Sequence, residues 1–188
     1  LIDALRCGLW RAVLPVLEAG ETHEGDAVRV LDADARTLGS LEAGEIDVAR
    51  ISGAWRVLAD LHELGISHGH LDATTVVVRD DGSPALTDFG AAQVAASAGA
   101  LKTDRAQLLV TTALAADTDR ALDGAAAVIG DSGLAEILPF LQPAVFDLDT
   151  RKAIRAEEWD LENLRTLTAE RTHVEIPPLE PIRRIVTP

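Results

Sequence analysis

Apolar residues recur at helical spacing through most of the chain after residue 45. Over residues 46–64 they are spaced by four and three, which predicts an amphipathic helix, and Gly65 supplies its left-handed stop. These positions are Ile51, Trp55, Leu58 and Leu61. A second helix is expected from a cap at Thr103 to about Ala116. It is apolar around nearly its whole circumference, which indicates a helix buried in the middle of a domain.

Further helices are expected toward the C-terminus. One spans residues 118–129 and ends at Gly130, another runs from Ser132 to about 141, and a longer one runs from about 149 to 171. A short helix is also expected over residues 1–12, and helix again after Gly90. Four prolines from residue 177 onward indicate that the tail beyond Glu175 is extended.

Strand signals are fewer and shorter. Residues 26–31 alternate polar and apolar side chains after a predicted hairpin turn at 18–25, and 32–39 reads as a polar connector. Residues 76–78 and 85–87 flank a turn signal that begins at Asp80, which predicts a tight hairpin. The expected fold class is therefore α+β and mostly α.

Charge and composition exclude several classes of function. The 188 residues carry a formal charge of −14, which argues against a nucleic-acid surface because phosphates are held by clustered lysine and arginine. Cys7 is the one cysteine, so an intrachain disulfide is impossible. The most apolar stretches are far shorter than the roughly 18 residues that a membrane span needs.

The chain begins on Leu1 and contains no methionine, which suggests a piece of a longer protein.

The most informative segment reads His-Gly-His-Leu-Asp-Ala-Thr-Thr from His68 to Thr75, and Asp88-Phe89-Gly90 follows after the hairpin. It resembles the protein-kinase catalytic loop H-R-D-x-x-x-x-N with its downstream D-F-G. On that pattern His70 stands for the catalytic aspartate, Thr75 for the metal-binding asparagine and Asp88 for the D-F-G aspartate. The offsets of five residues from His70 to Thr75 and eighteen from His70 to Asp88 suit this family.

The resemblance implies the fold of a kinase without the residues that catalyse phosphoryl transfer. A histidine lacks the fixed negative charge of the aspartate, and Asp72 has the wrong sign for a place that usually carries a cation. No Gly-rich loop or strand lysine precedes Pro15, and no A-P-E motif follows Gly90. Asp104 resembles the aspartate that braces the catalytic loop from below, so a structural role is expected for it.

The implied architecture is a kinase-like C-terminal lobe with a truncated or missing small lobe. Residues 1–36 would be the remnant of the small lobe and the hinge, 37–172 the helical lobe, and 173–188 an extended tail toward a possible membrane segment. The run from Leu61 through Ala92, with later segments, also resembles the kinase-like domain of actinobacterial lysylphosphatidylglycerol-synthase-type and flippase-like membrane proteins. That resemblance implies a location on the cytoplasmic side of the bacterial inner membrane, where Arg183 and Arg184 would precede a span.

Three classes of function follow from these residues. The first is a non-catalytic regulatory or scaffolding domain that needs no cofactor and binds a protein or its own transmembrane region. The second is a divergent small-molecule or lipid-head-group phosphotransferase, with Asp88, Phe89 and Gly90 at an ATP–Mg²⁺ site and Asp72 as base. The third is a phosphoprotein docking module, with the acceptors Ser97, Thr87, Thr103 or Thr111.

The histidines of this loop suit either a metal site or a simpler hydrogen-bonded scaffold. His68, His70, Asp72 and Asp88 offer imidazole and carboxylate ligands of the kind that Zn²⁺ or Mn²⁺ takes. Two histidines in one loop are more often a hydrogen-bonded scaffold, so no metal site is predicted.

Overall fold

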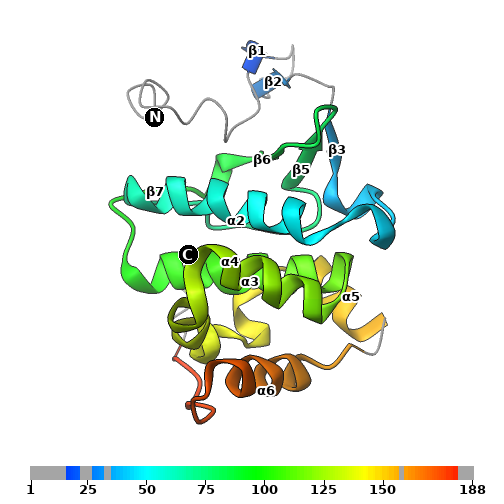
Figure 1. Ribbon diagram of the computed structural model, residues 1–188. Helices are drawn as coiled ribbons and strands as arrows, with labels where there is room; N and C mark the ends of the chain where they lie inside the picture. Colours follow the sequence, from blue (N-terminus) through cyan, green and yellow to red (C-terminus); the bar gives the residue numbers. More distant parts are fainter. Residues whose placement is uncertain (1–15, 22–26, 32–34, 157–158, 182–188) are drawn as a thin grey trace.

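The structure is a computed structural model that describes residues 16–21, 27–31, 35–156 and 159–181 of the chain. It is an α+β fold and mostly helical, as the sequence predicts. Helix α2 lies between the strands and the layer of α3 and α4, and α6 lies on the opposite side of that layer (Figure 1). The helix predicted over residues 1–12 lies outside the described residues.

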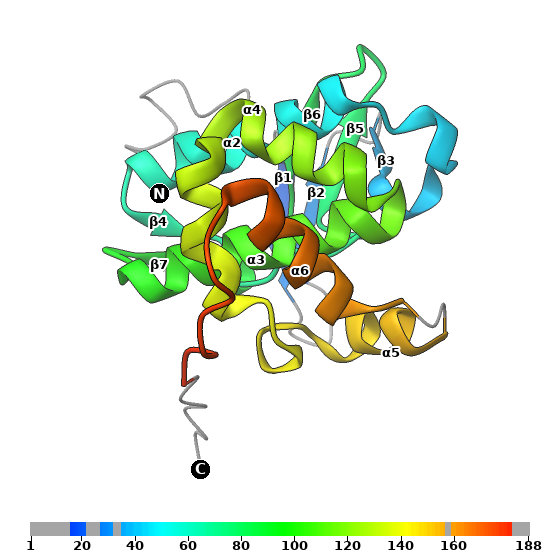
Figure 2. The ribbon, with the colours of Figure 1, turned by 60° about the horizontal axis from the view of Figure 1, so that its bottom comes forward.

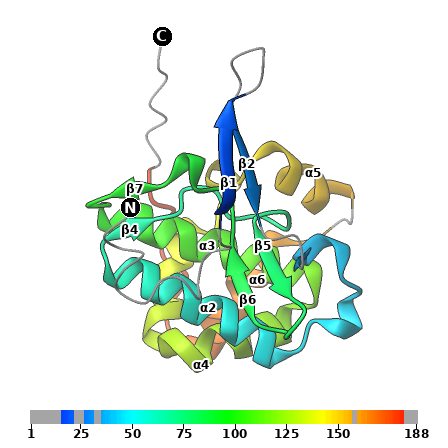
Figure 3. The same ribbon diagram turned by 90° about the horizontal axis from the view of Figure 1, so that it is seen from above.

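In the part of the chain that the structure describes, short antiparallel strands form three small sheets. β1 (Val16–Glu21) pairs with β2 (Ala27–Leu31). This hairpin lies above β5 and β6 in Figure 1 and nearer the top of the picture than those strands in Figure 3. Residues 18–21, which were expected in the turn, belong to β1, and residues 22–25 of the predicted turn lie outside the described residues. In the second sheet β5 (Val76–Arg79) lies between β3 (Ala35–Thr37) and β6 (Pro84–Leu86). The predicted polar connector thus contains a strand.

The predicted β5–β6 hairpin is confirmed. Val76 pairs with Leu86, and Gly82 takes a left-handed φ of 81° in the turn. The Asp81 carboxylate accepts hydrogen bonds from the backbone N–H and the hydroxyl of Ser83, at 2.8 and 2.6 Å, which closes the turn locally. This hairpin leads from the loop of residues 68–75 to Asp88.

Helix α2 (Val48–Glu63) confirms the first predicted helix. Asp47 caps it by accepting from the Arg50 N–H, and Gly65 follows its end with a φ of 68°. The predicted apolar stripe is buried and packs on α4 (Thr118–Ile137). Gly124 of α4 makes this approach possible, since a Cβ there would lie under 3.0 Å from the Ile51 side chain.

The two helices predicted on either side of Gly130 meet in a kink within α4. Gly130 has φ 66° and ψ 174°, outside the helical region, and the chain resumes its helix directly after it. α3 (Ala98–Ala115) is buried as predicted but begins earlier than Thr103, because the Ser97 hydroxyl accepts from the Ala100 N–H and caps the helix there.

Two predictions on the later chain are wrong. Residues after Gly90 do not begin a helix; they form a short 3₁₀ turn η4 (Phe89–Ala91) and then β7 (Gln93–Val94), which pairs with β4 (Ile66–Ser67). The single helix expected over 149–171 is two, α5 (Leu148–Ala156) and α6 (Leu161–Thr172). Asp160 starts α6 anew by accepting from the backbone N–H groups of Glu162 and Asn163.

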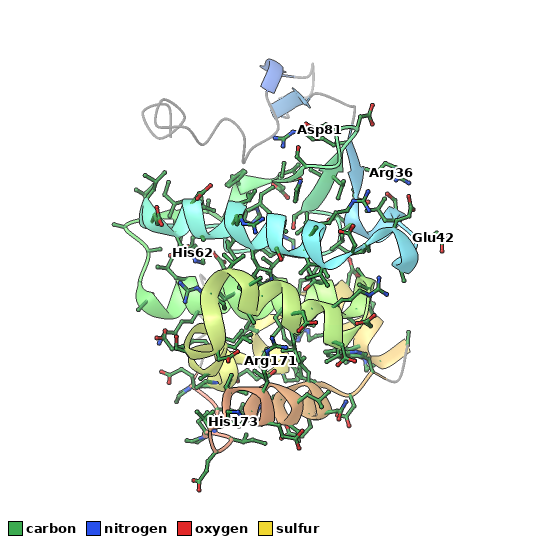
Figure 4. The ribbon with its side chains drawn as sticks, viewed as in Figure 1. Arg36, Glu42, His62, Asp81, Arg171 and His173 are labelled. Carbon is green, nitrogen blue, oxygen red and sulfur yellow. The ribbon has the colours of Figure 1, made fainter. Side chains whose placement is uncertain are left out.

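Single 3₁₀ turns connect several of these elements. They are η2 (Leu38–Ser40), η3 (Ala43–Glu45), η5 (Leu138–Phe140) and η6 (Pro143–Val145). α6 crosses the face of the helical layer, and Arg171 near its end pairs with Asp123 and Asp131 of α4 (Figures 2 and 4). Residues 174–181 form no helix, as expected for the tail. Among the described helices, none combines the length and hydrophobicity that crossing a bilayer requires.

Candidate functional site

A row of buried polar side chains on α3 supports the candidate site. Asp104, Gln107 and Thr111 are spaced by three and four residues, so they share one face of a largely buried helix. All three are buried, with 0%, 6% and 3% of their surface exposed. Buried polar side chains are stable when they are hydrogen-bonded, and each of these three binds the backbone of the loop of residues 68–75.

Asp104 holds the start of this loop. Its carboxylate accepts from the backbone N–H of His68 at 2.7 Å and from that of Gly69 at 2.8 Å. His62 approaches the same carboxylate from α2, with its Nε2 at 3.1 Å, and Figure 4 shows this side chain at the end of α2 beside the helical layer. Asp104 therefore supports the backbone at the start of the loop.

Gln107 and Thr111 hold the middle of the loop. Gln107 Oε1 accepts from the Leu71 N–H at 3.0 Å, and its Nε2 donates to the carbonyl oxygen of Val145 at 2.7 Å. The Thr111 hydroxyl donates to the Leu71 carbonyl at 3.3 Å. Sequence analysis missed Gln107 and treated Thr111 as a possible phosphate acceptor, whereas this hydroxyl is buried and engaged. The signal was present, since polar residues at i, i+3 and i+7 of an apolar helix need partners.

His68 joins the loop to the segment of residues 88–90. It is fully buried, and its Nε2 donates to the carbonyl oxygen of Thr87 at 2.8 Å. Its ring also lies against Phe89, with the centroids 4.7 Å apart and the planes tilted by 55°. Phe89 is partly buried against the main core. The two motifs singled out in the sequence are therefore in contact.

The burial of His68 makes stability depend on pH. Burial lowers the pKa of His68 below its usual range, although the Thr87 carbonyl and the Asp104 charge offset part of this effect. The unfolded chain then binds a proton that the folded chain resists, so the stabilising contribution is complete above pH 7 and falls as the pH drops below about 6.5.

We expect this effect to reach at most about 2 kcal/mol at pH 5. The measurement is urea unfolding of the parent chain and of His68→Gln, which retains a donor for the Thr87 carbonyl, from pH 8 to pH 5. The free energy of unfolding of the parent should fall faster than that of the variant. Parallel pH profiles would show that His68 titrates alike in the folded and unfolded chains.

Asp72 Oδ1 and the Thr75 hydroxyl form hydrogen bonds within the loop. The Asp72 Oδ1 accepts from the Thr74 hydroxyl and from the N–H groups of Thr74 and Thr75, at 2.7, 2.7 and 2.9 Å. The Thr75 hydroxyl lies 2.9 Å from the Asp72 N–H and 3.2 Å from its carbonyl oxygen. Burial opposes the charge of Asp72, but the hydrogen bonds from Thr74 and Thr75 outweigh it and lower the pKa of Asp72.

His70 contacts two carboxylates from different parts of the chain. Its Nε2 lies 3.3 Å from Asp72 Oδ2 and 3.1 Å from Asp147 Oδ2. Asp147 directly precedes α5, and its Oδ1 accepts from the Thr150 N–H at 2.5 Å. Sequence analysis missed Asp147, because 77 residues separate it from His70 and no local pattern marks it.

Asp88 is left outside this cluster. It is exposed, its φ of 55° is left-handed, and its carboxylate accepts from the Gly90 N–H at 3.4 Å. Among the described residues, the four ligands weighed in the sequence do not form one group; His70 and Asp72 gather with Asp147 instead of with His68 and Asp88.

A pocket of about 360 Å³ opens beside the loop. Asp72 and Thr74 line it from the loop, Leu38 from η2, Leu114 from α3 and Thr150 from α5. Its size lies within the range of small-molecule sites, and its lining is largely apolar with carboxylates at the wall.

Comparisons with known proteins leave the family open. No protein-family model matches the chain, and a search of curated proteins finds no match.

Proposed function

We propose that this chain is a non-catalytic, kinase-like regulatory or scaffolding domain. The observation that carries the proposal is the state of the loop of residues 68–75. Asp104 fixes its backbone, and His68 connects it to Phe89, so the loop has a defined conformation. At the position where a kinase needs a free carboxylate stands His70, in contact with Asp72 and Asp147.

The other catalytic positions support the same conclusion. Thr75 is buried and its hydroxyl is bound within the loop, so it is a poor replacement for a metal-binding asparagine. Asp72, the alternative base, has one carboxylate oxygen in the Thr74–Thr75 turn and the other against His70. Phosphoryl transfer depends on positioned, free groups of this kind.

The setting that we propose rests on the family resemblance. The domain would belong to a bacterial membrane protein of lipid or envelope-precursor handling and would lie on the cytoplasmic side of the inner membrane. Its partner would be another protein or its own transmembrane region.

The conformation of Asp88 favours a second candidate, ATP–Mg²⁺ binding without turnover or with weak phosphotransfer. A left-handed φ at a residue other than glycine costs free energy and often marks a functional position. The exposed carboxylate accepts one long hydrogen bond, so it remains open to a cation.

Thermal melting with ATP and Mg²⁺ tests the two candidates. For a scaffold, we expect the melting temperature with ATP–Mg²⁺ to stay within about 1 °C of that with Mg²⁺ alone, because a ligand raises it only by binding the folded state. Asp88→Ala is the test variant, and Asp80→Ala, which removes an exposed carboxylate in the hairpin turn, is its control. A nucleotide-dependent rise that Asp88→Ala abolishes and Asp80→Ala retains would contradict the scaffold and require a phosphotransfer assay.

A further inference from the structure

Three side chains beside the pocket converge on one point. His70 and Asp72 come from the loop, and Asp147 comes from the residue that precedes α5. One ligand atom of each residue lies within 4.8 Å of a ligand atom of the other two. His70 Nε2 faces Asp72 Oδ2 and Asp147 Oδ2. All three side chains are partly exposed, at 39%, 14% and 21%, so ions from solvent reach them.

The distances match the edges of a metal coordination shell. Zn²⁺ binds imidazole nitrogen and carboxylate oxygen at about 2.0–2.2 Å, so neighbouring ligand atoms in a tetrahedral site are separated by roughly 3.3–3.5 Å. His70 Nε2 lies 3.3 Å from one carboxylate oxygen and 3.1 Å from the other. A metal therefore fits between these atoms after small side-chain rotations.

Each carboxylate is oriented by its second oxygen. Asp72 Oδ1 is held by Thr74 and Thr75, and Asp147 Oδ1 by the Thr150 N–H, so in both residues Oδ2 is the atom turned toward His70. Metal sites use outer hydrogen bonds of this kind to fix their ligands. Arg151 donates to the backbone carbonyl of Asp147. Within the described residues, the ion-pair partner of each carboxylate is His70.

The two backbone segments are also held at a fixed separation. Gln107 binds the Leu71 N–H with one end of its amide and the Val145 carbonyl with the other. Leu71 lies between His70 and Asp72, and Val145 lies two residues before Asp147. Because Gln107 is buried, its bridge fixes the ligand positions before any ion binds.

We propose that His70, Asp72 and Asp147 bind a divalent transition-metal ion, with Zn²⁺ as the preferred ion. A neutral imidazole and two carboxylates give the site a charge of −2, which a divalent cation neutralises. The imidazole nitrogen favours Zn²⁺ over Mg²⁺ or Ca²⁺, which prefer oxygen ligands. Three protein ligands leave a coordination position open, and Asp72 and Thr150 place the site at the wall of the pocket.

A His70 Nε2–H group that donates to both carboxylates would also explain these distances, and metal titration separates the two explanations. Zn²⁺ is titrated by calorimetry into the full chain carrying Cys7→Ser, which removes the strongest competing zinc ligand. We expect one ion per chain at pH 7.5. In the same background, His70→Gln and Asp147→Asn should each weaken binding at least about tenfold. His173→Asn is the matched control, because it removes an exposed histidine outside the cluster and asparagine tolerates the φ of 57° at this position.

The absorption spectrum of bound Co²⁺ gives a second measurement, which reports on the metal ligands directly and not on the stability of the fold. Bound in place of Zn²⁺, it should produce a visible absorption band that His70→Gln and Asp147→Asn abolish and His173→Asn retains. Melting without metal shows that the variants remain folded. A chain that binds neither ion, or that binds Zn²⁺ equally in His70→Gln, Asp147→Asn and the control, overturns the proposal and leaves the hydrogen bonds between His70 and the two carboxylates as the explanation.

Discussion

Replacing Asp104 by alanine is expected to destabilise the chain by on the order of 3–5 kcal/mol. The substitution leaves the His68 and Gly69 N–H groups without their acceptor, and an unpaired buried polar group costs about 1–3 kcal/mol. It also removes the partner of the buried His62. The free energy of unfolding in urea measures this loss.

Two further variants make the Asp104 result specific. Asp104→Asn retains one acceptor oxygen but turns an NH₂ group toward a donor, so we expect an intermediate loss. Asp60→Ala removes an exposed aspartate of α2 and should change stability by less than about 0.5 kcal/mol. If Asp104→Ala unfolded no more easily than Asp60→Ala, then Asp104 would not be what holds the loop.

Replacing Gly69 by alanine is expected to cost roughly 2–4 kcal/mol. Gly69 has a φ of 81°, which is strained for any other residue, and a Cβ there would lie under 3.0 Å from the carbonyl oxygen of Ala91. Ala91 ends η4, directly after Asp88-Phe89-Gly90. The added methyl group would therefore push apart the two motifs that His68 and Phe89 connect. Urea unfolding again gives the measurement.

Gly82 supplies a matched control for this effect. It has the same φ of 81°, but a Cβ there meets nothing within 4 Å. Gly82→Ala should therefore cost only the backbone strain, about 1–2 kcal/mol. Equal losses in the two variants would mean that the approach of Ala91 to Gly69 contributes nothing.

The Gly69 geometry also bears on the proposed function. Gly69 stands where the kinase pattern H-R-D has arginine. The double substitution Gly69→Arg and His70→Asp would restore the letters of that pattern, but the backbone at Gly69 accepts no side chain without movement of Ala91. If the chain is the scaffold that we propose, its loop differs from that of a kinase in backbone conformation at Gly69 as well as in the residue at position 70.

The sequence by itself determined the elements whose signals are local. Helix α2 follows from an apolar stripe that ends at Gly65, and the β5–β6 hairpin follows from the turn beginning at Asp80. Gly130 likewise marked a true interruption of the helix, because its left-handed backbone depends on the residue itself.

Periodicity was a poorer guide where competing caps decide the boundaries. Ser97 and Thr103 both suit a helix start, and the chain uses Ser97, which lengthens α3 by more than one turn. Asp160 restarts a helix inside a stretch whose apolar spacing had suggested one element. Residues after Gly90 pair as β7 with β4, and such a partner, far away in sequence, leaves no local signal.

The candidate site was decided mostly by the tertiary structure. The sequence indicated the loop with His68 and His70, the segment from Asp88 and the bracing position of Asp104. Gln107 and Thr111 also bind the loop, but this depends on the packing of α3 beneath it. A buried polar side chain must form hydrogen bonds, and the tertiary fold decides which partner is within reach. Asp147 joined His70 and Asp72 across 77 residues because Gln107 ties the two segments together, and no spacing along the chain encodes that meeting.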